Sequence, residues 1–282
     1  MNSPAKSNVS QELILAARQG LLPVGERSWL GGFGNMLGKE LADWFGTHRW
    51  LTQMVLWLVI INGLMAFIIF VVPNFDPEEV LYTPEAKLAE GLALYFGFSV
   101  LLGTIGAIIL AQDEVIQEKQ TGTAAWILTK PVSRSSFILT KLLSNLVGVA
   151  LFIGLIPGAV AYLELYLNTG MFLSVMPFLM GIGAVLLNLA FYLALVIMLG
   201  TLFEERGPVL GVAAAVFIGG LIASQFFPQT SYVLPVNFRE IGPMLSMSQP
   251  LPDVAVIQLI VTAGWTVLFT LVALLRFRQM EF

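Results

Sequence analysis

Side chains that could do chemistry are few in this sequence, and most of them lie in one charged segment between residues 113 and 141. The chain has no cysteine and a single histidine, His48. Thiolate metal sites, histidine-based metal clusters and catalysis by a Ser-His-Asp or Cys-His arrangement are therefore nearly excluded. We expect no metal or cofactor site in the chain and no enzyme active site.

Nucleotide hydrolysis by this chain is also excluded. A phosphate-cradling loop needs the pattern Gly-x-x-x-x-Gly-Lys-Ser/Thr. The nearest match contains Gly38 and Lys39, but Phe33 occupies the first glycine position and Glu40 the Ser/Thr position. Any ATP-driven function would require ATP and Mg²⁺ bound by another chain.

The charged segment predicts a helix, a break, a short helix, a second break and a further helix. Residues 113–120 alternate charged and apolar side chains and are typical of a helix that continues from the preceding apolar run. Gly122 interrupts this pattern, and residues 123–128 form a short apolar stretch. Pro131 disfavours helical geometry at the residue before it, and Ser133 is well placed to cap the next helix.

Trp126, in the short apolar stretch, allows two interpretations. An exposed tryptophan favours a protein partner, because exposed aromatic side chains often anchor interfaces. Packing against the protein's own helices explains the same residue equally well, since single apolar surface residues are common.

The elements that must position this segment are membrane spans. Hydrophobic residues make up 57% of the 282-residue chain and charged residues only 11%, and the mean hydropathy is +0.84. The apolar residues form long runs of the ~20 residues that a bilayer requires. We therefore predict an all-α fold with spans at 50–72, 91–112, 137–163, 171–203, 209–227 and 254–275. Prolines at five positions in 228–253 exclude one continuous helix there.

Positive charge predicts the orientation, because Lys and Arg are retained on the cytoplasmic side. With six spans and the N-terminus in the cytoplasm, Lys87 and Arg239 are the only Lys and Arg residues on the outer side of the membrane. The first outer loop is acidic, with Glu85 and Glu90 among its charges. The predicted cytoplasmic set is Lys6, Arg18, Arg27, Lys39, Arg49, Lys119, Lys130, Arg134, Lys141, Arg206, Arg276 and Arg278. We expect a plasma-membrane protein with both termini in the cytoplasm, including segment 1–49 and tail 276–282. No secretory signal is expected at the start of the chain.

Residues 33–49 predict an amphipathic helix before the first span. Apolar side chains recur at steps of three and four residues, with Lys39, Glu40 and Asp43 on the other face. Such a helix lies in the membrane interface, where Trp44 would suit the headgroup zone. It would act either as a simple anchor or as a lever that contacts a cytoplasmic partner.

Two short motifs carry a resemblance to a known family. Residues 118–123 (EKQTGT) fit Glu-x-x-x-Gly-Thr, residues 128–134 (LTKPVSR) fit Leu-x-x-Pro-[Val/Ile]-Ser-Arg, and Lys141 follows seven residues later. In this order they resemble the connector between spans two and three in permeases of type-2 ABC transporters, a mostly export-directed family. The helix before the first span and the six-span plan match too. A weaker likeness is to permeases of multicopper-enzyme maturation, but Met244 and Met247 are only two thioethers, and no other soft ligand accompanies them.

The resemblance implies partners and a mechanism. The connector at 113–136 would include a coupling helix, around Gly122 and Thr123, that docks in a groove of a separate ATP-hydrolysing subunit. Two such ATPases, which bind ATP and Mg²⁺, would serve a dimer of this chain with a second copy or a paralogue. Their closure would reorient the spans. No nucleic acid partner is expected.

The resemblance also implies contact residues. Those that would couple to the ATPase or hold the coupling helix are Asp113, Glu114, Glu118, Lys119, Gly122, Thr123, Trp126, Leu128, Pro131 and Arg134. Those that would form a secondary contact are Lys39, Asp43, Glu204, Glu205 and Arg206. For the last three, Glu204, Glu205 and Arg206, an ordinary polar turn is the default interpretation.

Polar side chains that could mark a pathway are few in the predicted spans, namely Asn62, Asn145, Asn188 and Gln258, with Glu164 near the outer end of the third span. For the asparagines we favour hydrogen bonding between helices over substrate contact. So apolar a pathway disfavours a small ion and fits a lipid-like, peptidic or otherwise amphipathic cargo that is exported.

The sequence favours a permease over two other functions. An ion- or proton-coupled secondary transporter would be expected to carry charged residues in the middle of its spans, and none is predicted there. An intramembrane enzyme would need a paired nucleophile and base, and Asp113 at a span end has no such partner.

Overall fold

The computed structural model describes residues 29–75, 83–130 and 132–280, and every regular element in these ranges is helical. Predictions for residues 1–28 and for Pro131 lie outside them. Six helices are long and apolar enough to cross a membrane, and we number them as spans 1 to 6: Arg49–Asn74, Pro84–Gln120, Arg134–Thr169, Val175–Leu202, Arg206–Phe226 and Asp253–Gln279. The predicted all-helical, six-span architecture is confirmed, with spans 1, 2, 3, 5 and 6 extending a few residues beyond one or both predicted ends.

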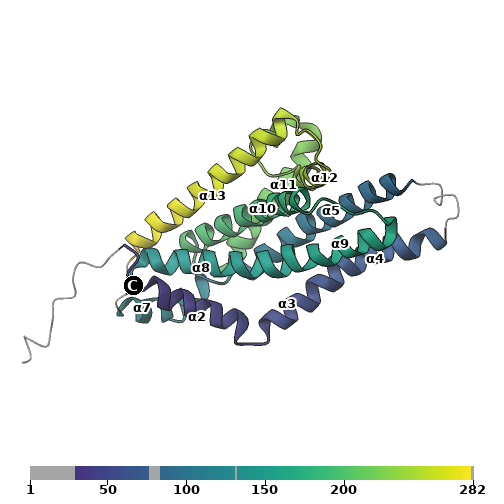
Figure 1. Ribbon diagram of the computed structural model, residues 1–282. Coiled ribbons are helices and arrows are strands. Elements are labelled where there is room, and N and C mark those ends of the chain that lie inside the picture. The colour runs from purple at the N-terminus through teal and green to yellow at the C-terminus, as the bar shows by residue number, and fades with distance from the viewer. Residues whose placement is uncertain (1–28, 76–82, 131, 281–282) are drawn as a thin grey trace, which may run out of the picture.

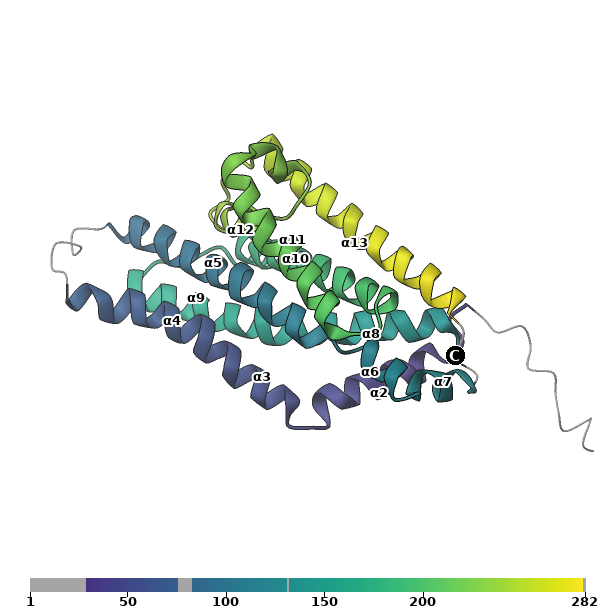
Figure 2. The same ribbon diagram turned by 180° about the vertical axis from the view of Figure 1, so that it is seen from behind.

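Span 4, helix α10 (Val175–Leu202), is the centre of the bundle (Figures 1 and 2). It packs against α5 (Pro84–Ala111), α8 (Arg134–Val149) and α13 (Asp253–Gln279). Of its most apolar 18-residue window 78% is buried, compared with 17% for α13 and 22% for α11 (Arg206–Phe226). Spans 5 and 6 therefore present apolar faces that lipid or another chain would cover.

Spans 1 and 3 are not regular α-helices along their whole length. Span 3 contains a π-helical stretch, η5 (Ala150–Leu155), directly before α9 (Ile156–Thr169). Pro157 explains the irregularity, because a proline inside a helix has no N–H group for the carbonyl four residues earlier. Span 1 consists of α3 (Arg49–Trp57), η1 (Leu58–Gly63), α4 (Leu64–Ala66), η2 (Phe67–Val71) and η3 (Val72–Asn74), of which η1 and η2 are π-helical.

The proline-rich segment between spans 5 and 6 forms two short helices, in agreement with the exclusion of a single long one. They are η6 (Pro228–Tyr232) and α12 (Phe238–Ser246). The second packs against α5 and α10, with Phe238 and Ile241 buried. It lies at the far end of the bundle from α2 (Figure 1).

Helix α2 (Phe33–Phe45) confirms the predicted helix before span 1, but it packs on the protein rather than presenting Trp44 to headgroups. Its buried side chains are Met36, Glu40 and Trp44. Trp44 is only 1% exposed and its ring stacks on that of Phe152 at 5.9 Å between centroids. The expectation that Trp44 lies in the headgroup zone is therefore wrong.

A glycine on α8 makes this close approach possible. A Cβ atom added to Gly148 would lie 2.5 Å from the indole of Trp44, so a side chain at 148 and the tryptophan exclude each other. We refer below to the α2 end of the bundle, which is formed by α2, the segment 112–133, the start of α3, the first half of α8, the first turn of α11 and the last turn of α13. The described Lys and Arg residues other than Lys87 and Arg239 belong to elements at this end.

We expect Gly148→Ala to displace α2, because overpacking of this kind costs about 1–3 kcal/mol. The chain has no cysteine, so a single Met36→Cys, on the buried face of α2, reports displacement through its reaction with a thiol reagent. Reactivity should rise in Gly148→Ala. It should not rise in Gly183→Ala, the matched control, where an added Cβ meets nothing within 4 Å. Equal reactivity in both variants would show that this contact does not hold α2.

Candidate functional site

The connector between spans 2 and 3, residues 112–133, lies at the α2 end and holds most of the predicted contact residues. It contains α6 (Ile116–Gln120) and α7 (Thr123–Leu128), separated by a break at Gly122. The predicted order of helix, break, short helix, break and helix is confirmed. One detail is wrong: α5 ends at Ala111, and a turn at 112–115 separates it from α6. Glu114 in this turn and Glu118 in α6 both lie against Lys141 of α8.

Local backbone chemistry explains both breaks. Gly122 has φ 72°, in the left-handed region that favours glycine, and it precedes the first residue of α7. Ser133 caps α8 as predicted, since its hydroxyl accepts a hydrogen bond from the N–H of Ser136 at 3.0 Å. The same hydroxyl donates to the carbonyl of Trp29 at 2.6 Å, which ties the chain before α2 to the start of span 3.

Helix α7 is held by small and aliphatic side chains rather than by its tryptophan. Ala124 and Ile127 are buried in an apolar cluster with residues of α2, α8, α10 and α13. Leu128 is partly buried against the same cluster. Trp126 is 63% exposed, and Lys130 Nζ lies over its ring, 4.9 Å from the centroid. The tryptophan is thus presented at the surface on a helix fixed by its other face.

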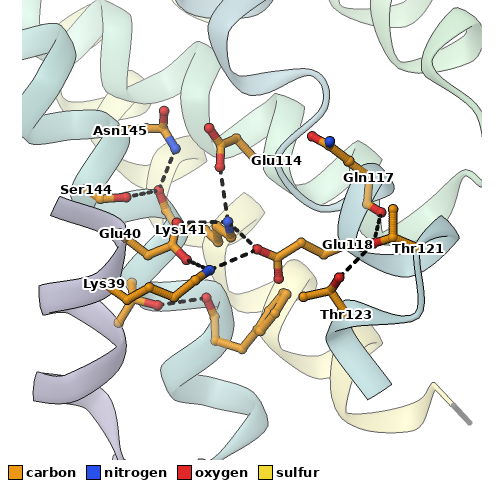
Figure 3. A network of polar contacts seen from close by, with 12 residues as sticks. Lys39, Glu40, Glu114, Gln117, Glu118, Thr121, Thr123, Lys141, Ser144 and Asn145 are labelled. Atoms are coloured by element: carbon orange, nitrogen blue, oxygen red, sulfur yellow. Dashed lines mark hydrogen bonds and ion pairs between the residues drawn. The ribbon is translucent and has the colours of Figure 1, made fainter. Parts of the chain in front are cut away.

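A buried lysine on α8 gathers the acidic side chains of the α2 end (Figure 3). Lys141 Nζ lies 2.7 Å from Glu118 Oε1, 2.8 Å from Glu40 Oε2 and 3.3 Å from Glu114 Oε2. The Lys141 and Glu40 side chains are only 5% and 4% exposed. The ammonium group therefore joins α2, the α5–α6 turn and α6 to span 3.

Two further cations balance the three carboxylates. Lys39 Nζ lies 3.1 Å from Glu40 and 3.5 Å from Glu118, and Arg49 Nη2 lies 3.3 Å from Glu114. Burial disfavours the charge on Lys39, but attraction to Glu40 and Glu118 outweighs it, so the pKa of Lys39 is raised above its usual value. Buried charges are tolerated when they are paired and hydrogen-bonded in this way.

The connector is also fixed to the turn between spans 4 and 5. Lys119 Nζ donates to the carbonyls of Phe203 at 2.8 Å and Gly200 at 3.3 Å, and it lies 3.0 Å from the carboxylate of Glu204. These carbonyls end α10, where a cation is favoured by the helix dipole.

The same turn contains two more of the predicted secondary contacts. Arg206 Nε lies 2.7 Å from Asp113 Oδ1, so this pair adds a second tie between the connector and span 5. Glu205 is exposed beside them. The structure thus brings Glu204 and Arg206 against the connector, rather than leaving them in an isolated polar turn.

Arg134, at the start of α8, secures the end of span 6. Its Nη1 donates to the carbonyls of Arg278 at 2.6 Å and Met280 at 2.7 Å. Arg278 is in the last turn of α13 and Met280 follows the helix, so neither carbonyl has an N–H partner further along a helix. Span 3 and span 6 are therefore joined at the α2 end.

A polar cavity of about 490 Å³ lies between α2 and the connector. Five of the predicted contact residues line it, namely Asp43, Asp113, Glu114, Glu118 and Thr123. Within the described ranges, no three His, Asp or Glu side chains are placed to hold a metal ion. The lining of this cavity is polar and largely charged.

The three asparagines that the sequence predicted within the spans, Asn62, Asn145 and Asn188, make different contacts. Asn62 Nδ2 donates to the carbonyl of Pro157 at 3.0 Å and so joins span 1 to span 3. Asn188 Nδ2 donates to Thr104 Oγ1 at 2.8 Å and joins span 4 to span 2. Asn145 donates to the carbonyl of Lys141 in its own helix. Two of them therefore link helices, as favoured from the sequence.

Sequence reasoning missed Glu40 as part of this site and assigned it to the polar face of α2. Its position one residue after Lys39 suggested a solvated helix surface. The available signal was its spacing of four residues from both Met36 and Trp44, which places it between two residues of the buried face. Lys141 was predicted only as part of the family motif and as one of the cytoplasmic Lys and Arg residues, not as the centre of an ion-pair cluster.

The six spans and the ion-paired connector define an all-helical, multi-pass membrane protein with a structured polar end. Residues 55–282 match the model of a family described as "Protein of unknown function (DUF2705)". The chain belongs to this family. No curated protein matches the sequence.

We expect Lys141→Met to destabilise the α2 end strongly, because it leaves three carboxylates around a site that has lost its central cation. Removing one member of a buried ion pair typically costs about 3–5 kcal/mol. Unfolding by denaturant in detergent micelles measures this loss. Adding Glu118→Gln should recover part of it, since one uncompensated charge is then removed.

Lys130→Met is the matched control, because Lys130 is exposed and should tolerate the same change. If the two single variants lose the same stability, the buried ion pairs do not organise the connector.

Proposed function

We propose that this protein is the membrane-spanning permease subunit of an ATP-driven transporter of the type-2 ABC class. Two permeases, either two copies of this chain or this chain and a paralogue, would act with two separate ATPase subunits. The observation that carries the proposal is the exposed Trp126 on α7, because this short helix is fixed on its other face to three spans. Exposed aromatic side chains on a rigid element are typical anchors of protein interfaces.

The contacts of the connector supply a route for force. A partner that moves α7 would move span 3 through Ser133 and the buried face of α7. It would move span 4 through Lys119. Because packed helices rearrange as rigid bodies, a displacement at the α2 end would change how the spans pack along their length.

The distribution of charge supports an orientation with the α2 end in the cytoplasm. All described Lys and Arg side chains other than Lys87 and Arg239 belong to this end, and positive charge is retained inside. The ATPases would then meet α7 on the side where ATP is present. We place the protein in the plasma membrane with both termini inside.

The apolar surfaces of spans 1, 5 and 6 support a dimer and an amphipathic cargo. Their most apolar windows are 28%, 22% and 17% buried within this chain, compared with 78% for span 4. Lipid would cover part of these surfaces, and a second permease the rest. A lipid-like or peptidic cargo matches walls of this composition better than a hydrated ion does, and we propose that it is exported.

We expect the purified protein to retain an ABC ATPase encoded beside it and to stimulate its ATP hydrolysis. Trp126→Ala should weaken this association about thirtyfold, the loss of an interface anchor worth about 2 kcal/mol. The affinity is measured with the two components purified separately.

Phe172→Ala is the matched control, because Phe172 is similarly exposed, at 76%, and lies in the loop between spans 3 and 4 at the other end of the bundle. Failure to bind any ABC ATPase, or equal affinities for Trp126→Ala and the unaltered protein, would contradict the proposal.

A further inference from the structure

A carboxylate lies inside the bundle, away from the α2 end. Glu164 belongs to α9 in span 3, and its Oε2 lies 3.5 Å from Nδ2 of Asn62. Asn62 is in the middle of span 1 (Arg49–Asn74) and is only 3% exposed. The pair is therefore placed at the depth where charged and polar side chains are rare and usually have a role in binding or transport.

The hydrogen bonds of Asn62 and Glu164 use the Nδ2 group of Asn62 and leave only oxygen acceptors available for a ligand. A carbonyl oxygen can only accept a hydrogen bond, so the Asn62 amide presents its Nδ2 to the carbonyl of Pro157, at 3.0 Å. Asn62 Oδ1 is then buried without a partner in the described part of the chain. Glu164 adds a carboxylate that forms no ion pair with any described Lys, Arg or His.

The backbone around the pair is irregular on both helices. Asn62 lies in the π-helical stretch η1, and Pro157 is the second residue after the π-helical stretch η5. Short π-helical stretches are frequent at functional sites. Here they turn a carbonyl and an amide of neighbouring spans toward the same point.

The pair is reachable from the side of the bundle. Glu164 is itself only partly buried, and its neighbours Leu163 and Leu167 are 54% and 65% exposed. On span 1, Leu64 and Phe67 are 44% and 54% exposed. A ligand that places a donor against the acceptors would therefore lay any apolar portion along these side chains.

We infer that Asn62 and Glu164 bind the protonated amine of an amphipathic molecule. An ammonium group offers three N–H donors and a positive charge, which match the free Asn62 Oδ1 and the unpaired carboxylate. The identification of this molecule as the transported cargo rests on the proposed function, whereas the binding site does not. The cargo class would then be cationic lipids or peptides with an amine and an apolar portion.

Binding of radiolabelled dodecylamine to the purified protein in a neutral detergent tests the inference. Glu164→Gln keeps the size of the side chain and a hydrogen-bonding group for Asn62, but removes the charge. We expect it to weaken dodecylamine binding at least tenfold, because hydrogen bonds to a charged group are about twice as strong as neutral ones and the ion pair is lost as well. Glu164→Asp, which keeps the charge but shortens its reach, should have an intermediate effect.

Two controls separate this site from general partitioning of an amphiphile. Glu90→Gln removes an exposed carboxylate of span 2 and should leave binding unchanged. Unlabelled dodecanol, which has the same apolar chain without the charge, should fail to displace dodecylamine. Each variant is first shown to unfold at the temperature of the unaltered protein.

Equal binding by the unaltered protein and Glu164→Gln, or displacement by dodecanol, would overturn the inference and leave the ATPase partnership standing. Failure of the proposed function alone would give a different result. Glu164-dependent binding in a protein that retains no ATPase would support the site and remove the proposed function.

Discussion

The structure of the α2 end depends on the charge of Lys141. An ammonium group that is 5% exposed is stable only where opposite charges surround it, and isolated buried charges cost several kcal/mol. Here three glutamates from α2, the α5–α6 turn and α6 supply the compensation. Each glutamate in turn needs the lysine. The position of α2 and the path of the connector are therefore set together, and neither can move without exposing a charge to an apolar interior.

Two other cations extend this arrangement across the bundle. Lys119 occupies the carbonyl end of α10 and Arg134 that of α13, where unpaired carbonyls and the helix dipole favour positive charge. The connector thereby joins spans 3, 4 and 6 by side chains whose partners are backbone groups. Such contacts transmit displacement better than apolar packing alone, because their geometry is directional. Trp126, which takes no part in them, is left to the surface.

The sequence was sufficient for the spans and for the breaks in the connector. Long apolar runs leave few alternatives to membrane helices, and Gly122 and Ser133 act through local backbone geometry that does not depend on distant residues. The contacts of the site itself were harder to predict from the sequence. The burial of Glu40 and Trp44 depends on Gly148 and Lys141, about a hundred residues further along the chain, and no local pattern encodes that contact.

The same reasoning explains why Glu164 was not singled out from the sequence as a binding residue. From sequence it was one polar residue near a span end, and only the register of α9 against η1 brings it to Asn62. The two polar sites also differ in physical character. At the α2 end every described cation of the cluster faces a carboxylate, whereas the Glu164 carboxylate beside Asn62 forms no ion pair with a described Lys, Arg or His. The first suits a mechanical linkage and the second suits a ligand.

Chemical labelling at residue 126 tests the central claim most directly, namely that α7 faces the cytoplasm and is covered by an ATPase. Trp126→Cys introduces one thiol into a chain with no other, and sealed vesicles of known orientation allow a membrane-impermeant maleimide to reach one face at a time. The account predicts labelling from the cytoplasmic face alone, and protection only at ATPase concentrations high enough to offset the roughly thirtyfold weaker binding expected when the indole is lost. Labelling from the external face would contradict it.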